Sequence, residues 1–287
     1  MKFLNLFISL LLTTNVFAEC DHTLAKKIYA LLDNAIQESN ATNGCIAIME
    51  ATTGKLVMKI GDVDERQPTK LFTPIALLAC MESGQIKLTD MIDTGDGIYI
   101  SGADTIKDHN WRRGGYGEVS VLGGFVRYSN IATFKMIKKV FKQPTDYQQQ
   151  LERMGINDIE NIDNIYYNAS PLQILTLYNM IANNTMKALP SHIEAVRQAL
   201  RSNVVDGLGK LAALTKVEIA GYGRMVHLTD STYKADFCGY FPADNPEYTI
   251  IVSLKKEDGQ EAKRESMSLF RRLAELLDGL KRKKLDT

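Results

Sequence analysis

The chain has 287 residues, of which 45% are hydrophobic and 24% are charged, and its formal net charge at pH 7 is zero. These values describe an ordinary globular protein with one large domain or two small ones. A net charge of zero gives no electrostatic basis for nucleic-acid binding, so we expect no nucleic-acid partner. The basic run Lys281-Arg-Lys-Lys284 lies at the end of the chain, where a solvated tail is the simplest interpretation.

The first 18 residues have the organisation of a secretory signal. Lys2 gives a positive start, residues 3–12 are apolar but too few to span a bilayer, and Val16-Phe-Ala18 is a small-residue cleavage site. We predict that residues 1–18 are a signal peptide and that the remaining chain is exported, to the periplasm or the cell envelope. No transmembrane span is expected after cleavage. The alternative is an uncleaved segment that serves as a marginal anchor.

The cysteines and histidines show no metal-binding pattern. The cysteines are irregularly spaced, which indicates neither a zinc site nor a disulfide framework. They are Cys20, Cys45, Cys80 and Cys238. The last three lie in apolar runs and are predicted to be buried thiols. The histidines are scattered, and the sequence around His109 is typical of a surface loop, so we expect neither a metal nor a cofactor.

The N-terminal part of the mature chain predicts a helix followed by a hairpin. Apolar residues recur at helical spacing over residues 22–38, which indicates an amphipathic helix. Short apolar runs at residues 45–49 and 56–58 predict two strands. Ala51-Thr-Thr-Gly54 supplies the turn between them, because its glycine tolerates positive φ.

The middle of the chain is predicted to be mostly helical. Pro171 is suited to the first position of a helix, and Ser170 before it is a favourable N-cap. Helices are expected at residues 75–83, 121–128, 131–141, 171–182 and 191–201.

The C-terminal part predicts three strands and a last helix. The strand-like runs lie at residues 217–220, 235–240 and 248–254, and an amphipathic helix follows at residues 267–280. Strands at both ends of the chain, with helices between them, predict one sheet that closes across the whole sequence. The sequence has no internal repeat and no low-complexity linker, so a single domain is favoured.

Several stretches together resemble the transpeptidase domain of penicillin-binding proteins, especially the class B type. The most specific are Ser170-Pro-Leu-Gln-Ile-Leu-Thr-Leu-Tyr-Asn-Met-Ile-Ala-Asn183 and Phe237-Cys-Gly-Tyr-Phe-Pro-Ala-Asp-Asn-Pro246. Others are Ala47-Ile-Met-Glu-Ala-Thr-Thr-Gly54, Phe72-Thr-Pro74, Leu77-Leu-Ala-Cys-Met-Glu-Ser-Gly84, Ile92-Asp-Thr-Gly95, Ile106-Lys-Asp108, Tyr116-Gly117 and Tyr128-Ser-Asn-Ile131. Their order and spacing make chance agreement a poor explanation. Residues 19–287 are therefore expected to form one domain that resembles this family.

The resemblance implies an α+β fold of the β-lactamase and transpeptidase type. In such a fold an antiparallel sheet of about five strands has terminal helices on one face and a mostly helical subdomain on the other. The family's chemistry uses three motifs. In the first, Ser-x-x-Lys, a serine at a helix start attacks an acyl donor and a lysine three residues later accepts its proton. A Ser-x-Asn element and a Lys-Thr-Gly strand complete the proton relay and orient the substrate.

All three motifs are changed in this sequence. Alignment on Pro74 puts a lysine at the nucleophile position and a threonine at the base position. In the second motif a tyrosine precedes the retained Ser-Asn, and in the third Ala220-Gly-Tyr-Gly-Arg224 replaces Ala-Gly-Lys-Thr-Gly, with a one-residue slip as an alternative that keeps the second glycine. The residues at the motif positions are Lys70, Thr73, Tyr128, Ser129, Asn130, Tyr222, Gly223 and Arg224. The fold should bring these positions together whatever residues occupy them.

We therefore predict a pseudoenzyme that binds or scaffolds in peptidoglycan processes at the cell envelope. The expected partner is a peptidoglycan stem peptide or another cell-envelope protein. Tyr128 and Tyr222 either fill the space left by the lost relay or stack on a ligand, with filling favoured. Arg224 is suited to hold a carboxylate by a two-pronged contact.

The alternative is an active D,D-transpeptidase or a β-lactam-acylated hydrolase with a relocated nucleophile. Thr73 would then attack and Lys70 would accept the proton, because the i,i+3 spacing is symmetric. Against this, a β-branched hydroxyl in a helix tends to hydrogen-bond the preceding carbonyls. Ser231-Thr-Tyr-Lys234 and Ser253-Leu-Lys-Lys256 also match Ser-x-x-Lys, but they fall in strand or loop regions and are interpreted as accidental.

Overall fold

A computed structural model describes residues 22–285, apart from residues 103, 159, 164 and 229–230. Its centre is a five-stranded antiparallel sheet with the strand order β10-β11-β12-β1-β2. The strands are β1 (Asn43–Glu50), β2 (Leu56–Ile60), β10 (Ala220–His227), β11 (Tyr233–Phe241) and β12 (Tyr248–Lys256). The predicted signal peptide and Cys20 lie outside the described residues.

The pairing of β1 with β12 joins the two ends of the chain in this sheet. It runs from Asn43 opposite Lys255 to Glu50 opposite Tyr248. The prediction that residues 45–49 and 248–254 share one sheet is therefore confirmed. Both faces of the sheet are covered by helices, which explains why residues 45–49 are all buried rather than alternating between core and solvent.

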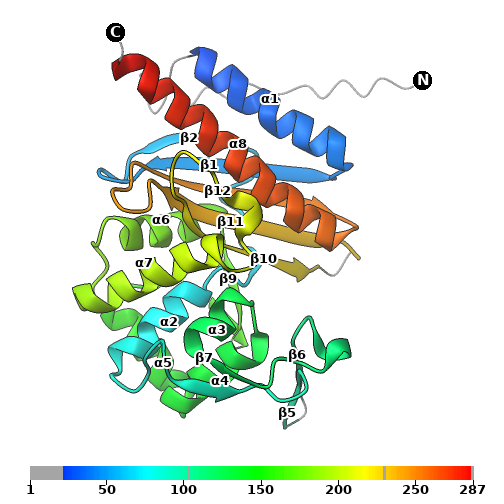
Figure 1. Ribbon diagram of the computed structural model, residues 1–287, viewed down its shortest axis with the longest axis vertical. Helices are drawn as coiled ribbons and strands as arrows, with labels where there is room; N and C mark the ends of the chain where they lie inside the picture. The colour runs from blue at the N-terminus through cyan, green and yellow to red at the C-terminus, as the bar shows by residue number, and fades with distance from the viewer. Residues whose placement is uncertain (1–21, 103, 159, 164, 229–230, 286–287) are drawn as a thin grey trace.

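Helices from the two chain ends cover one face of the sheet (Figure 1). They are α1 (His22–Ser39) and α8 (Gly259–Leu285), which pack side by side. The ring of Phe270 on α8 packs edge-on against Phe237 of β11, with the ring centroids 4.7 Å apart. Helical spacing gathers the apolar side chains of α8 on the side that faces the sheet, as the amphipathic pattern predicts.

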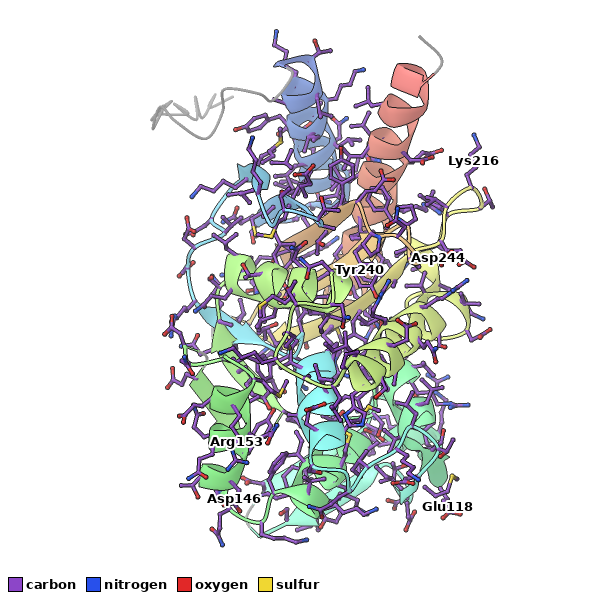
Figure 2. The ribbon with its side chains drawn as sticks, turned by 90° about the vertical axis from the view of Figure 1, so that its left-hand side faces the viewer. Glu118, Asp146, Arg153, Lys216, Tyr240 and Asp244 are labelled. Carbon is purple, nitrogen blue, oxygen red and sulfur yellow. The ribbon has the colours of Figure 1, made fainter. Side chains whose placement is uncertain are left out.

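A subdomain made mostly of helices covers the other face, as the resemblance implies. Its helices α6 (Pro171–Ala182) and α7 (Pro190–Val205) pack against the sheet. The remaining helices are α2 (Thr73–Glu82), α3 (Val121–Val126), α4 (Asn130–Val140), α5 (Pro144–Arg153) and the 3-10 helices η1 (Trp111–Arg113) and η2 (Lys210–Ala212). Figure 2 shows the subdomain extending away from the terminal helices, with Glu118, Asp146 and Arg153 at its far end.

Short strands complete the subdomain in three small sheets, which have the orders β3-β9-β8, β4-β7 and β5-β6. Their bounds are β3 (Gln67–Thr69), β4 (Met91–Asp93), β5 (Ile98–Ser101), β6 (Asp104–Lys107), β7 (Glu118–Ser120), β8 (Glu160–Asp163) and β9 (Tyr166–Ala169). The β5–β6 hairpin lies at the periphery of the subdomain (Figure 1).

Several elements differ from the sequence predictions, among them the short strands β3 to β9, which were not predicted, and α8, which begins at Gly259 rather than at residue 267. The strand predicted at residues 217–220 is wrong, because β10 begins at Ala220 and continues to His227. The two glycines in β10 have low strand propensity, so the strand depends on its pairing with β11 rather than on local preference. The helix predicted to reach residue 128 ends at Val126. Helix α5 has no counterpart among the predicted helices, because it buries just Tyr147 and Leu151.

The described cysteines are buried free thiols, as the sequence predicts. Burial raises the pKa of Cys45 to about 12, and it also raises the pKa of Cys80 and Cys238. These thiols are therefore protonated and unreactive near neutral pH. Outside the gaps named above, no helix of residues 22–285 has both the length and the apolar character that crossing a bilayer requires.

Gly239 of β11 offers a test of the packing between β10 and β11. A Cβ atom there would lie 2.5 Å from Ala220 O and 2.8 Å from Gly221 Cα. Because both atoms belong to the neighbouring backbone, Gly239→Ala must shift β10, and we expect the free energy of unfolding to fall by about 1–3 kcal/mol. Urea unfolding measures the change.

Gly279→Ala in α8 is the matched control, since nothing lies within 4 Å of a Cβ atom at that position. It should stabilise the protein by about 0.5–1 kcal/mol, because alanine restricts the unfolded chain and favours the helix. Equal stability of Gly239→Ala and the wild type would contradict the observed register of β10 and β11.

Candidate functional site

Lys70 lies at the junction between β3 and α2. Its side chain is buried, with 7% relative exposure. The Nζ atom donates to Asn130 Oδ1 at 3.3 Å and lies 4.1 Å from the centroid of the Tyr166 ring. The amine that the motif alignment matches to the nucleophile is therefore held between a side-chain amide and an aromatic face.

Thr73, at the base position, is the first residue of α2. Its side chain is buried, and its hydroxyl donates to Lys70 O at 2.8 Å. This is the bond to a preceding carbonyl that a β-branched hydroxyl favours in a helix. The hydroxyl proton is thus engaged by the backbone, which gives no support to Thr73 as a nucleophile.

Ser129 acts as the N-cap of α4. Its hydroxyl accepts a hydrogen bond from Ala132 N–H at 2.9 Å and donates to Asp108 Oδ2 at 2.7 Å. Both Ser129 and Asp108 are fully buried. Ser129 therefore stabilises the helix start, and its hydroxyl is bonded to a buried carboxylate.

Asn130 links the first and third motif positions. Its Oδ1 accepts hydrogen bonds from Lys70 Nζ and from Arg224 Nη2. Its Nδ2 donates to Lys107 O at 2.7 Å. The side-chain amide is thus fixed on both ends, by two cations and by the backbone of β6.

Tyr128 covers the free edge of β10. Its backbone is left-handed, with φ 57°, which is rare for a bulky residue. Its hydroxyl accepts hydrogen bonds from Gly223 N–H at 3.3 Å and from Asn203 Nδ2 at 3.1 Å. Asn203, on α7, also donates to Gly221 O at 2.8 Å. Side chains of the protein itself therefore occupy the C=O of Gly221 and the N–H of Gly223.

Arg224 is buried and donates hydrogen bonds to three residues of the site. Nη1 donates to Tyr128 O at 3.0 Å and to Tyr222 Oη at 3.4 Å, and Nη2 donates to Asn130 Oδ1. These bonds meet the requirement that a buried charge be hydrogen-bonded. An external carboxylate would have to displace them, so the geometry does not favour the predicted two-pronged contact with a ligand.

Tyr222 is fully buried, and its hydroxyl donates to Phe125 O at 3.3 Å. Its ring centroid lies 4.4 Å from that of Phe125 and 4.8 Å from that of Tyr128. This packing favours the space-filling role of the two tyrosines over stacking on a ligand. Burial raises the pKa of both tyrosines, and in Tyr222 it outweighs the opposing effects of Arg224 and Thr73. Both hydroxyls are therefore protonated near neutral pH and are unsuited to act as bases.

The structure thus brings most motif positions into direct contact, although the hydroxyl of Ser129 is bonded to Asp108 and Ala132 rather than to another motif residue. It also adds residues that no motif indicates: Tyr166 beside Lys70, Asn203 beside Tyr128, and Lys263 of α8. Lys263 Nζ lies 4.5 Å from the centroid of the Tyr128 ring. Burial, with repulsion from Arg224, lowers the pKa of Lys263 to about 8.

A cavity of about 340 Å³ opens beside the motif residues. Of the motif residues, Lys70 and Asn130 line the cavity, while the buried side chains of Tyr128 and Tyr222 do not. The lining residues are Lys70, Asp104, Thr105, Ile106, Lys107, Asn130, Phe134, Ile165 and Tyr166. The four residues of β6 therefore form one wall, and Ile165 and Tyr166 form part of another.

His109 is exposed, as predicted, and does not line this cavity. Its Nε2 lies 3.1 Å from the hydroxyl of Tyr116. Partial burial lowers the pKa of His109, and the nearby Lys263 and Arg224 act in the same direction. The ring is therefore neutral near pH 7.

Tyr128→Phe tests the closure of the β10 edge. The change removes the acceptor for Gly223 N–H and for Asn203 Nδ2, both of which are buried beside it. We expect the free energy of unfolding to fall by about 1–3 kcal/mol, the cost of leaving a buried polar group unsatisfied. Tyr29→Phe, at an exposed position on α1, is the control and should be neutral. An equally neutral Tyr128→Phe would show that the hydroxyl does not close the edge.

Lys263 generates a test based on pH. Its pKa falls from 10.5 to about 8 on folding, so between these values the unfolded state binds more protons and stability rises with pH. Lys263→Met removes this dependence. The wild type should gain about 2 kcal/mol in unfolding free energy relative to Lys263→Met between pH 7 and pH 9.5. Lys210→Met, at an exposed site, is the control, and urea unfolding at both pH values measures the difference. Parallel pH profiles of wild type and Lys263→Met would contradict the buried environment of Lys263.

Comparison with known proteins places this geometry in a family. The chain matches the family model of the penicillin binding protein transpeptidase domain over residues 44–275. Among curated proteins, none matches the chain.

Solved structures agree with this match in fold. The TP domain of penicillin-binding protein 3 from Burkholderia pseudomallei superposes with a TM-score of 0.79 at 16% identity, covering 90% of this chain and 94% of that one. A peptidoglycan glycosyltransferase from Burkholderia ambifaria has a TM-score of 0.76 at 17% identity, covering 90% and 97%. Penicillin binding protein 3 from Mycobacterium tuberculosis, complexed with aztreonam, has a TM-score of 0.77 at 18% identity, covering 92% and 78%. Together, the matched family model and the shared fold show that the chain belongs to the penicillin-binding protein transpeptidase-domain family.

Proposed function

We propose that this chain is an exported, catalytically degenerate member of the family, which acts in the cell envelope by binding rather than by acyl transfer. The observation that carries the proposal is the geometry at the helix start. The position of the family's serine holds the buried amine of Lys70, bonded to Asn130, and the position of the family's lysine holds Thr73, whose hydroxyl is bonded to Lys70 O.

Acylation needs a nucleophile with a base beside it, and this arrangement supplies neither. A lysine amine is ordinarily protonated near neutral pH and then has no lone pair with which to attack. Burial raises the pKa of Tyr222 and of Tyr128, so both hydroxyls stay protonated near neutral pH and no tyrosinate is available to accept a proton. A threonine hydroxyl does not accept a proton usefully in this pH range. These features support a function in which the protein binds a partner and does not catalyse acyl transfer.

The location and partners in this proposal come from other observations. Residues 1–18 have the pattern of a signal peptide. Transpeptidase domains of this family typically work at the cell envelope, which agrees with an exported chain. A peptidoglycan stem peptide or another cell-envelope protein is therefore the partner that we propose.

Labelling with a fluorescent penicillin tests the proposal, because covalent capture reports a working nucleophile directly. We expect no covalent label on the wild type, while a penicillin-binding protein that keeps the serine and lysine of the first motif is labelled in parallel. The double variant Lys70→Ser with Thr73→Lys should also remain unlabelled, since Tyr128 and Tyr222 still replace the rest of the relay and catalytic groups act as a unit.

A variant with all three motifs restored should regain slow labelling. It carries Lys70→Ser, Thr73→Lys, Tyr128→Ser, Tyr222→Lys, Gly223→Thr and Arg224→Gly. The proposal is wrong if the wild type forms a stable penicillin adduct. Loss of that adduct in Thr73→Ala, with retention in Ser129→Ala, would identify the swapped pair as an active site.

A further inference from the structure

The cavity beside Lys70 is bordered by an unpaired strand edge. All four residues of β6 line it, and among the strands that the structure describes β6 pairs with β5 alone, on its other side. Three of the four, Asp104, Thr105 and Lys107, are exposed. We propose that this edge binds an extended peptide from a partner protein, which adds to the β5–β6 hairpin as a third strand. The inference rests on the proposed binding function and names its ligand class.

The register of the hairpin decides which backbone groups face the cavity. Asp108 N–H donates to Gly97 O at 3.0 Å, so this pair is hydrogen-bonded. Hydrogen-bonded and non-hydrogen-bonded pairs alternate along an antiparallel ladder. The next pair, Lys107 with Ile98, is therefore non-hydrogen-bonded, and so is Thr105 with Ile100. The N–H and C=O groups of Thr105 and Lys107 consequently point away from β5.

A contact with the motif residues confirms this direction. Lys107 O accepts a hydrogen bond from Asn130 Nδ2 at 2.7 Å, from the side opposite β5. Among the described residues, the N–H of Lys107 and both backbone groups of Thr105 have no hydrogen-bond partner. Two donors and one acceptor on one strand edge fit the backbone of a second strand, which is how strand addition binds peptides.

The contrast with β10 makes the edge of β6 more informative. β10 is also an edge strand, but Tyr128 and Asn203 occupy its outward groups at Gly223 and Gly221. Side chains of the protein therefore occupy two outward groups of β10 but just one of β6, whose other outward groups, at Thr105 and Lys107, border a cavity. Exposed strand edges are usually protected, so an open edge beside a cavity suits a partner.

The cavity itself fits such a peptide in size and charge. Its volume of about 340 Å³ falls near the lower end of the range typical of ligand sites, roughly 300–1,000 Å³. Ile106, Phe134 and Ile165 offer an apolar surface for one side chain of the peptide. The charged lining residues are Lys70, Lys107 and Asp104, a balance that favours an acidic peptide over a basic one.

Thr105→Pro tests the proposal with little change to the hairpin. Proline removes the outward N–H and is tolerated on a strand edge whose N–H is not part of the ladder. Thr105→Val keeps the N–H and is the matched control. The full-length protein and both variants are presented with a displayed library of random seven-residue peptides, and the selected peptides are synthesised to measure affinity.

We expect acidic peptides with an apolar residue to be selected by the wild type and by Thr105→Val, and to bind Thr105→Pro at least tenfold more weakly. In an extended peptide, alternate N–H groups point to opposite sides. N-methylation of the residues whose N–H groups face β6 should abolish binding, and N-methylation of the intervening residues should not. This test remains valid even if Thr105→Pro does not fold. Failure to select any peptide, or undiminished binding to a folded Thr105→Pro, would overturn the inference. So would a dimer of the protein that Thr105→Pro dissociates, because the occupant would then be a second copy of the chain.

The result of the peptide selection can be distinguished from the result of the penicillin labelling that tests the proposed function. Penicillin labelling of a protein that still selects peptides through β6 would refute the loss of catalysis and leave this inference standing. An unlabelled protein that selects no peptide would refute the inference alone.

Discussion

The antiparallel pairing of β1 with β12 is the constraint on which the site depends. It joins residues 43–50 to residues 248–255 in one sheet, in which β12 pairs with β11 and β11 with β10 at the far edge. The helical subdomain packs against the same sheet, which places the start of α2 next to β10. Pairing between residues so far apart in the sequence costs loop-closure entropy. Once the sheet has formed, the three segments that carry the motif positions lie together whatever side chains they have. The sheet therefore does not depend on which side chains occupy the motif positions.

Within that frame, a buried cation determines how the site is filled. The guanidinium of Arg224 has to be hydrogen-bonded, because an unpaired buried charge is costly. Its bonds to Tyr128 O and Asn130 Oδ1 hold the second motif against the third, and Asn130 in turn holds Lys70. The result is a connected polar network where the family has a catalytic relay. Tyr128 lies at the edge of β10, and its neighbour Asn130 lies at the edge of β6.

Local signals allowed much of the fold to be predicted from the sequence. Helix α6 has the predicted bounds, because Ser170 and Gln173 form a capping box and Pro171 follows the cap. The order of the motifs predicted the sheet and the contact among motif positions. The rest was not predictable from local pattern. Strand β10 carries glycines and depends on its neighbour, and the bond between Asn203 and Tyr128 joins residues 75 positions apart. Lys263 reaches the site from the terminal helix, and no motif spacing encodes that contact.

Hydrogen exchange of individual backbone amides tests the central claim most directly, since the account depends on one strand edge being closed and another open. In the full-length protein, the amide of Gly223 should be strongly protected, because its N–H is bonded to the buried hydroxyl of Tyr128. The amide of Thr105 should exchange close to the rate of an unstructured peptide. Fast exchange at Gly223 together with protection at Thr105 would contradict the account, because β10 would then be the open edge and β6 the closed one.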